Sequence, residues 1–163
     1  MNTSVVDIIV IGAGHAGLSI SYYLKRLQVN HLVFEKGNIG ESWRTQRWNS
    51  FKLNTPTKVN LLPGRDNSLI EDEEFWTAGE FISILEDYSR TFQLPVHEHC
   101  EVFSVEKTPG SEFFTVRVSQ KGSFKKYLCK LIVVASGFQN NKSIPAISNN
   151  LGPRSPVFLI ATS

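Results

Sequence analysis

The sequence predicts an α/β fold in which a parallel β-sheet carries an inserted antiparallel β-meander. Residues 5–35 contain a strand, a glycine turn, a helix and a second strand, which together make one βαβ unit. Residues 96–130 contain three further strand patterns, and residues 131–135 form a continuous apolar run. Parallel strands buried on both faces are continuously apolar, whereas antiparallel strands with one exposed face alternate.

Length and composition are those of a globular domain of ordinary size. The chain has 163 residues, of which 41% are hydrophobic, 11% aromatic and 20% charged. This mixture argues against a disordered or fibrous protein. Seventeen basic and fifteen acidic side chains leave a formal net charge of +2, which is too small to predict nucleic acid as a partner.

Neither a membrane nor a metal is expected as a partner. The first four residues carry no basic side chain, which argues against a signal peptide, and the longest apolar runs are far shorter than the roughly 20 residues that cross a bilayer. Cys100 and Cys129 form neither a C-x-x-C pair nor a cluster with histidine. Two such thiols are typical of a reduced, cytoplasmic protein without a redox dithiol or a zinc site.

The βαβ unit is predicted from three segments. Residues 5–11 are nearly all apolar, as a buried parallel strand requires. A helix is expected from Gly14 to residues 29–30, because Ile20, Leu24 and Leu27 recur at helical spacing, with Leu18 and Tyr23 beside them. Residues 31–35 then form the second strand.

The segment that follows combines a long loop and a second helix. Residues 36–64 are rich in Gly, Asn, Arg, Trp and Pro, which predicts a loop long enough to suggest a function. The acidic run at residues 71–74 is expected to face solvent. Thr77 and Glu80 have the spacing of a capping box, and a helix should follow and end at Leu94 and Pro95. Its apolar face would carry Phe81, Ile84, Leu85, Tyr88 and Phe92.

The last part of the chain predicts the meander and the final parallel strand. Residues 96–107, 114–119 and 124–130 are expected to be strands, separated by turns at Pro109-Gly110 and Lys121-Gly122. Residues 131–135 are expected to be a separate, buried parallel strand that ends at Ser136 and Gly137. From residue 140 onward the sequence shows no clear period.

A glycine motif predicts a dinucleotide site. Residues 12–17 read Gly-Ala-Gly-His-Ala-Gly, a G-x-G-x-x-G motif between a strand and a helix. Gly12 permits the tight turn, Gly14 lets a pyrophosphate approach the backbone, and Gly17 lets the helix pack closely. The amides at the helix start favour an anion. Glu35 follows 21 positions after Gly14 (from 14 to 35), where it can bind both ribose hydroxyls and repel a 2′-phosphate. The pattern suits FAD or NAD better than NADP.

Three segments resemble the FAD-binding part of the flavin-containing monooxygenase-like flavoproteins. They are residues 12–17 with Glu35 and Lys36, residues 39–44 (Ile-Gly-Glu-Ser-Trp-Arg), and residues 131–138 with Ile144 and Pro145. Gly-Glu-Ser-Trp and Ala-Ser-Gly stand where the family has G-G-x-W-like and A-T-G patterns. The resemblance implies a Rossmann-like, glutathione-reductase-like FAD-binding domain, in which a β-meander is inserted before the last parallel strand.

The resemblance also implies which residues contact the cofactor. Trp43 would lie beside the isoalloxazine, and an arginine would approach the phosphates. Asn54 would lie near the flavin edge, where its amide could serve catalysis; the alternative is an ordinary turn asparagine before a proline. The expected cofactor-binding residues are Gly12, Gly14, His15, Ala16, Gly17, Glu35, Lys36, Ser42, Trp43, Arg44, Val102, Ala135 and Gly137.

Other polar and aromatic residues have two interpretations each. Arg47 and Trp48 belong to a basic, aromatic cluster that could stack nucleic-acid bases or simply pack in the loop. The helix N-terminus favours a neutral imidazole at His15, which is expected to be a surface residue of the phosphate turn rather than a catalyst. His97 and His99 would share one strand face and could chelate a metal, but no third ligand is evident, which favours a solvated face.

The predicted function is that of the FAD-binding portion of a monooxygenase-like oxidoreductase. In a complete family member NADPH would reduce FAD, which would then activate oxygen. Residues 1–139 are expected to form the N-terminal segment of the FAD domain, and residues 140–163 a tail towards an absent NAD(P)H domain, because no second G-x-G-x-x-G motif occurs. The alternatives are a truncated FAD-binding module without turnover, and a chain completed by a partner polypeptide or by self-association.

Overall fold

The computed structural model describes residues 3–65, 75–107 and 109–137 and has the expected α/β architecture. The predicted acidic run at residues 71–74 and the tail at residues 140–163 lie outside these ranges. The strands are β1 (Thr3–Ile11), β2 (His31–Phe34), β3 (Val96–His97), β4 (Cys100–Lys107), β5 (Phe114–Gln120) and β6 (Ser123–Val134). The helices are α1 (His15–Arg26), α2 (Glu41–Thr45), the 3-10 helix η1 (Thr57–Val59) and α3 (Ala78–Thr91). None of the helices within the described ranges is long and apolar enough to cross a membrane.

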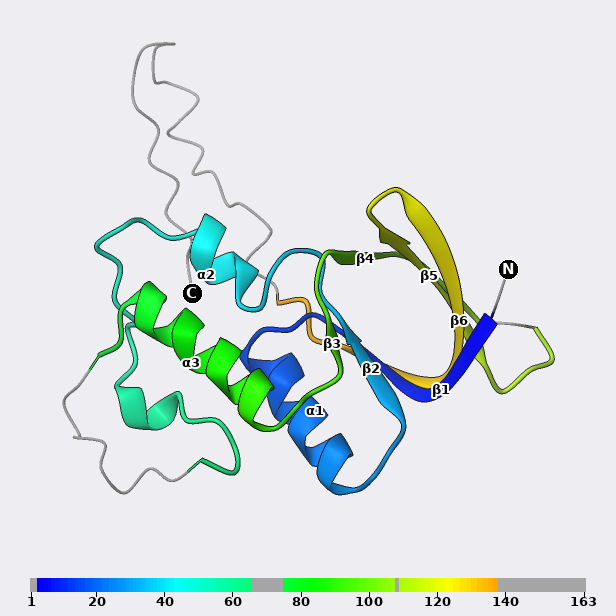
Figure 1. Cartoon of the computed structure of the whole chain (residues 1–163), viewed down its shortest axis with the longest axis horizontal. Helices are drawn as coiled ribbons and strands as arrows, with labels where there is room; N and C mark the ends of the chain where they lie inside the picture. Colours follow the sequence, from blue (N-terminus) through cyan, green and yellow to red (C-terminus); the bar gives the residue numbers. More distant parts are fainter. Residues whose placement is uncertain (1–2, 66–74, 108, 138–163) are drawn as a thin grey trace, which may run out of the picture.

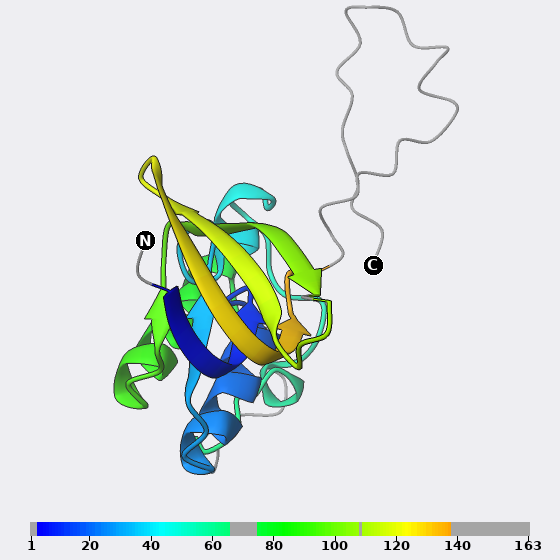
Figure 2. The same ribbon diagram turned by 90° about the vertical axis from the view of Figure 1, so that its right-hand side faces the viewer.

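A parallel half and an antiparallel half share one sheet, with the strand order β3-β2-β1-β6-β5-β4. β1 is parallel to both of its neighbours, β2 and β6, and β3 is parallel to β2. β5 is antiparallel to both β6 and β4, which makes the predicted meander. The helices lie beside the parallel strands, and the meander extends from the other end of the molecule (Figure 1). In Figure 2 the meander faces the viewer as a strongly twisted layer.

One long strand replaces two predicted ones. The sequence predicted separate strands at residues 124–130 and 131–135, but β6 is continuous over 12 residues. Its first part pairs with β5 through residues 123–129, while residues 126–134 pair with β1 on the other edge. The change of pattern near Lys130 therefore marks a change of neighbours along one strand. The prediction of full burial is also wrong at Leu131 and Val134, which are 49% and 73% exposed.

The predicted strand at residues 96–107 is divided. β3 ends at His97 and pairs with β2, whereas β4 begins at Cys100 and pairs with β5. His99 between them has a left-handed backbone with φ of 55°, which breaks the extended conformation. The amide of Cys100 still donates to the carbonyl of Glu35 at 2.8 Å, so the start of β4 lies directly beside the end of β2.

Helix α1 matches the predicted apolar face only in part: Leu18 and Leu24 are buried and Ile20 is partly buried, but Tyr23 is 51% exposed. Its buried residues include Leu18, Ser21, Tyr22 and Leu24, whereas Leu27 is 73% exposed. The helix ends at Arg26, before the expected residues 29–30, so Leu27 is its C-cap. Ser21 is buried because its hydroxyl bonds with the buried His31 of β2 at 2.8 Å. A small polar residue thus occupies the helix face that a hydrophobic pattern assigns to solvent.

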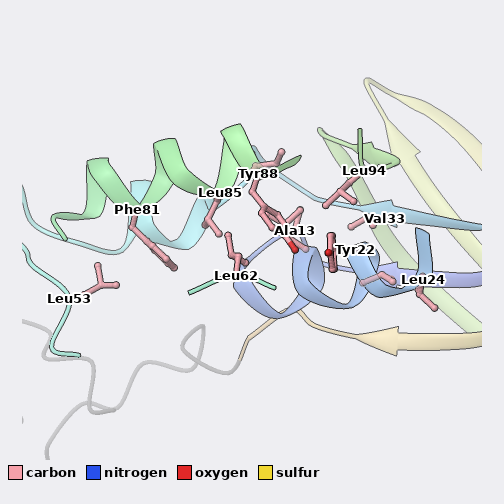
Figure 3. Close-up of a cluster of buried hydrophobic side chains, with 13 residues drawn as sticks. Ala13, Tyr22, Leu24, Val33, Leu53, Leu62, Phe81, Leu85, Tyr88 and Leu94 are labelled. Carbon is pink, nitrogen blue, oxygen red and sulfur yellow. The ribbon is translucent and has the colours of Figure 1, made fainter. Parts of the chain in front are cut away.

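Two apolar clusters cover the two faces of the sheet. The larger one joins α1, α3 and the parallel strands through residues such as Leu18, Val33 and Leu85. Figure 3 shows Leu53 and Leu62, from the connection between the helices, pointing into this cluster with Phe81 and Tyr88. The smaller cluster contains Phe34, Val116 and both buried cysteines, and it lies between the parallel strands and the meander.

The predicted loop at residues 36–64 contains two short helices. Gly40 has a left-handed backbone with φ of 71° and precedes α2, whose residue Trp43 donates its amide to the Gly40 carbonyl at 2.9 Å. The η1 helix follows Pro56, and its residue Thr57 is buried. Five and three residues are too few for a periodic pattern to become visible, which explains why the sequence predicted only a loop.

The predicted capping box of α3 is confirmed. The Thr77 hydroxyl accepts from the Glu80 amide at 3.2 Å, and the Glu80 carboxylate accepts from the Thr77 amide at 2.8 Å. Phe81, Leu85 and Tyr88 are buried as predicted, while Ile84 and Phe92 are partly buried against the same cluster. The helix ends at Thr91, three residues before the predicted stop at Leu94, and Phe92 is its C-cap.

Replacing Thr77 by alanine is expected to lower the free energy of unfolding by about 1 kcal/mol near neutral pH. The hydrogen bonds from Thr77 lower the pKa of Glu80. Stability that depends on this carboxylate is present above its unfolded pKa of about 4.3 and is lost as the pH falls through its lower folded pKa. Urea unfolding near pH 7 and about pH 3 measures the free energy of unfolding of Thr77→Ala and of wild type. The difference between the two proteins should be smaller in acid. An equal difference at the two pH values would contradict the stabilising role of the Glu80 carboxylate.

Candidate dinucleotide-binding site

The three glycines of the turn between β1 and α1 meet different surroundings. A Cβ on Gly12 would lie 2.6 Å from the Ala135 carbonyl oxygen, and one on Gly17 would lie 1.9 Å from the Gly12 oxygen. Gly12 also has φ of +104°, which favours glycine. A Cβ on Gly14 would meet no atom within 4 Å. Gly12 and Gly17 are therefore required by packing, whereas Gly14 borders open space.

That open space lies before the start of α1. Gly14 is the N-cap and provides no side-chain hydrogen bond, and the first turn contains no acidic residue. Amides of the first turn have no acceptor within the helix, and the helix dipole places positive charge there. Ala16 is exposed at this position. The accessible backbone and uncapped amides fit the anionic pyrophosphate of a dinucleotide.

Glu35 connects the end of β2 to the glycine turn. Its Oε2 accepts from the Ala13 amide at 2.8 Å, and its Oε1 accepts from the Gly37 amide at 2.9 Å. These two bonds hold the carboxylate in one orientation beside the turn. A carboxylate has about four acceptor positions, so each oxygen can accept a further hydrogen bond. The arrangement fits two neighbouring hydroxyls such as those of a ribose.

Two further residues extend this side of the site. The exposed ammonium of Lys36 pairs with Glu101 of β4 at 2.8 Å, and this carboxylate raises the pKa of Lys36. Val102, the next residue of β4, is partly buried against the smaller apolar cluster. Sequence reasoning did not single out Glu101, because only the contact between β2 and β4 brings it to Lys36.

The end of β6 closes the turn from the opposite side. Ala135 donates its amide to the Ile11 carbonyl at 2.8 Å, and its Cβ would lie 3.5 Å from a Cβ on Gly17. Gly137 is exposed and has φ of +72°, with no atom within 4 Å of an added Cβ. Ala135, just after β6, therefore meets the predicted glycine turn, whereas Gly137 borders open space.

Helix α2 lies close to the same turn, but its residues Trp43 and Arg44 contact α3. The Gly40 amide donates to the Ala13 carbonyl at 3.3 Å. The half-buried Trp43 packs edge-on against Phe81, with the ring centroids 5.1 Å apart. Arg44 pairs with Glu86 of α3 and donates from Nε to the Ile39 carbonyl at 3.4 Å. Ser42 on this helix is half-buried.

The neighbouring Arg47 packs within the protein, whereas Trp48 stays largely exposed. The Arg47 guanidinium lies over the Trp43 and Phe51 rings at 4.9 and 5.1 Å from their centroids, and burial lowers its pKa. Trp48 remains 64% exposed, although its ring meets Phe51 edge-on at 4.9 Å. For Arg47 the structure favours the packing interpretation over base stacking.

The remaining histidine predictions need correction. His15 is half-buried rather than a free surface residue, because its ring stacks on Phe81 at 6.0 Å and its Nε2 lies 3.2 Å from the Asn60 carbonyl oxygen. His97 and His99 do not share a strand face, since β3 ends at His97 and His99 lies in the turn. Among the described residues no group of three potential metal ligands is present.

Asn54 lies at the exposed edge of the segment between α2 and η1. Its predecessor Leu53 is buried and donates its amide to the Trp76 carbonyl at 2.8 Å. The amide group of Asn54 is therefore presented at the surface by an anchored backbone.

Residues 9–153 match the model of the pyridine nucleotide-disulphide oxidoreductase family. The chain belongs to this family. It is 34% identical to the uncharacterized oxidoreductase CzcO of Bacillus subtilis over 148 residues, which cover 89% of this chain and 40% of CzcO. The chain thus spans less than half the length of this relative.

Solved structures confirm the fold. Bacillithiol disulfide reductase from Bacillus cereus has a TM-score of 0.78 at 24% identity, covering 88% of this chain and 43% of the reductase. Flavin-containing monooxygenase from Stenotrophomonas maltophilia has a TM-score of 0.73 at 23% identity, covering 88% of this chain and 42% of the monooxygenase. Proteins with this fold also include a steroid monooxygenase solved with NADP and OTEMO solved with FAD and NADP.

Proposed function

We propose that this chain binds FAD as part of a monooxygenase-like oxidoreductase. The observation that carries the proposal is the pair of hydrogen bonds that holds Glu35 beside the glycine turn, next to the open side of Gly14 and the uncapped start of α1. An anion site and a ribose-binding carboxylate are then side by side, as the ADP half of FAD requires. The names of the related monooxygenases support a flavin rather than NAD alone.

Each residue in the proposed site has one role. Amides of Gly14, His15, Ala16 and Gly17 would face the pyrophosphate, and Glu35 would accept from the ribose hydroxyls. Lys36 and Val102 would border the nucleoside, and Ala135 and Gly137 would close the strand end. Ser42, Trp43, Arg44 and Asn54 would serve the flavin half, with Asn54 presenting its amide as a hydrogen-bonding group at the reactive edge. Bound FAD would supply the electron transfer between NADPH and oxygen in a complete protein.

Turnover would then require parts beyond this FAD-binding segment. Residues 1–139 would contribute the FAD-binding segment, and the remaining 60% of a CzcO-like protein would be needed to bind NADPH and the substrate. The second candidate is therefore an FAD-binding module without activity of its own, or one completed by a partner chain. The coverage of 40% favours this candidate for the isolated chain.

An absorbance titration separates these possibilities. The purified 163-residue chain is mixed with FAD, filtered to remove free flavin, and scanned for flavin bands before and after NADPH is added. Retained bands that NADPH does not bleach would support the module, whereas bleaching would support turnover by this chain. A colourless protein after filtration would contradict FAD binding.

Replacing Gly14 by alanine is expected to weaken FAD binding without unfolding the protein. The Gly14 backbone is extended, with φ of −84° and ψ of −169°, and the new methyl group meets no protein atom within 4 Å. Stability should therefore change by less than about 0.5 kcal/mol. Crowding of the ligand by the methyl group costs about 1–3 kcal/mol, which corresponds to roughly a 5- to 150-fold increase in Kd. Equal FAD affinity of wild type and Gly14→Ala in fluorescence titrations would contradict the proposed pyrophosphate position.

A further inference from the structure

We propose that His15 is a positioning residue that fixes the turn of residues 55–60, and with it Asn54, to the start of α1. This turn is called the 55–60 turn below. The significance of Asn54 rests on the proposed function, but the connection itself rests only on contacts within this chain. His15 belongs to the glycine motif and the turn lies about 45 positions later, so no local pattern relates them.

The His15 ring contacts two residues outside the dinucleotide turn, Asn60 and Phe81. Its Nε2 lies 3.2 Å from the carbonyl oxygen of Asn60. Because a carbonyl can only accept, the hydrogen must be on Nε2, which donates. The ring also stacks on Phe81 of α3, at 6.0 Å between centroids and 24° between planes. Stacking fixes the plane of the imidazole, so the Nε2 hydrogen is aimed at one acceptor.

The acceptor belongs to a turn that is closed by its own hydrogen bonds. The Asn60 side chain donates from Nδ2 to the carbonyls of Thr55 and Pro56, at 3.1 and 2.9 Å. The Thr55 hydroxyl donates to Asn60 Oδ1 at 3.0 Å. The amides of Val59 and Asn60 donate to Pro56 and Thr57, each at 3.0 Å. Holding the Asn60 carbonyl therefore holds the whole 55–60 turn.

Asn54 is placed between this turn and a second fixed point. Leu53 is 4% exposed and is bonded to the Trp76 carbonyl, while Thr55 begins the 55–60 turn. Only the Asn54 backbone separates the two. The hydrogen bond from His15 thus decides how the turn, and the side chain before it, are oriented relative to the first amides of α1. The site for the pyrophosphate and the residue proposed for the flavin edge are joined through one imidazole.

Four variants of residue 15 in the full chain test this connection without any cofactor. Glutamine places its Nε2 at nearly the reach of the histidine Nε2, whereas asparagine is too short, and phenylalanine keeps the stacking but has no donor. Hydrogen exchange of the Val59 and Asn60 amides is followed by mass spectrometry or NMR. Loss of the donor in His15→Phe and His15→Asn should make exchange about fivefold faster, and His15→Gln should restore the wild-type rate. His15→Ala, without ring and donor, should exchange at least as fast as His15→Phe.

The exchange pattern also shows what would overturn the proposal. Equal rates in wild type and His15→Phe, or equal acceleration in His15→Gln and His15→Asn, would show that the donor does not hold the turn. Acceleration that extends equally to the amides of α3 would show an effect on the whole fold instead. If His15→Phe fails to fold, the exchange rates of His15→Gln and His15→Asn are compared instead. Faster exchange in His15→Asn alone then supports the role of the donor. FAD titration of the wild type is a separate measurement, so failure of the proposed function leaves this result interpretable.

Discussion

Alanine at Gly17 is expected to destabilise the protein by about 3 kcal/mol or more. The new Cβ would lie 1.9 Å from the Gly12 carbonyl oxygen and 3.0 Å from its carbon. Both are backbone atoms of the turn that also packs on Ala135, so the clash can be relieved only by separating α1 from the strands. Because the free energy of unfolding of a domain is only about 5–15 kcal/mol, this substitution removes a large share of it. Urea unfolding followed by circular dichroism measures the loss.

Gly79→Ala is the matched control for this prediction. Gly79 lies in α3, is exposed, and has no atom within 4 Å of an added Cβ. Alanine has the higher helix propensity, but Gly79 is only the second residue of α3, so this variant should be as stable as wild type or more stable by up to about 0.5 kcal/mol. A Gly17→Ala protein as stable as Gly79→Ala would show that α1 and the glycine turn do not approach each other as closely as the structure has them.

Glutamine at position 35 is expected to weaken the binding of ADP and FAD strongly. The carboxylate accepts from the amides of Ala13 and Gly37, one on each oxygen. Glutamine has the same shape but only one acceptor, so its NH₂ group must face one of these two donors. Hydrogen bonds to a charged group contribute about 1.5–3 kcal/mol, which corresponds to roughly a ten- to hundredfold change in Kd. Isothermal titration with ADP and fluorescence titration with FAD measure the effect.

Glu80→Gln tests whether the loss is specific to the nucleotide site. Glu80 also accepts from a backbone amide and a second group, through Thr77 at the start of α3, but it takes no part in the proposed site. This variant should lose some stability and keep wild-type affinity for ADP. Equal losses of affinity in Glu35→Gln and Glu80→Gln, or no loss in either, would contradict the ribose role of Glu35.

The features that were predictable from sequence are those encoded within a few residues. The turn at residues 12–17 requires glycine for local reasons, and the capping box of Thr77 and Glu80 satisfies amides only three positions apart. Alternation of Phe114, Val116 and Val118 predicts β5 because side chains in a strand point to opposite faces. Each of these signals depends on backbone geometry that does not change with the rest of the fold.

The sequence predictions failed where contacts with other elements, rather than the local pattern, decide the boundaries of a strand or the buried face of a helix. β6 changes its pattern because it pairs with β5 up to residue 129, whereas its pairing with β1 starts at residue 126 and continues to residue 134. β3 and β4 are divided by the left-handed His99, which a strand pattern does not reveal. Helix α1 buries Ser21 because His31 supplies a partner, so hydrophobic spacing found Leu18 and Leu24 of the buried face but not Ser21.

By itself, the sequence determined the fold class, the glycine turn and the carboxylate expected to accompany it. The motif and the two flanking strands are adjacent in the chain, so their relation follows from local conformation. Only the tertiary structure decided that Arg44 faces Glu86, that Lys36 pairs with Glu101, and that His15 reaches Asn60. Those contacts join residues far apart in sequence, and they form only when the strands and helices pack. The prediction of a dinucleotide site could therefore precede the structure, whereas the way that site is joined to the segment carrying Asn54 could not.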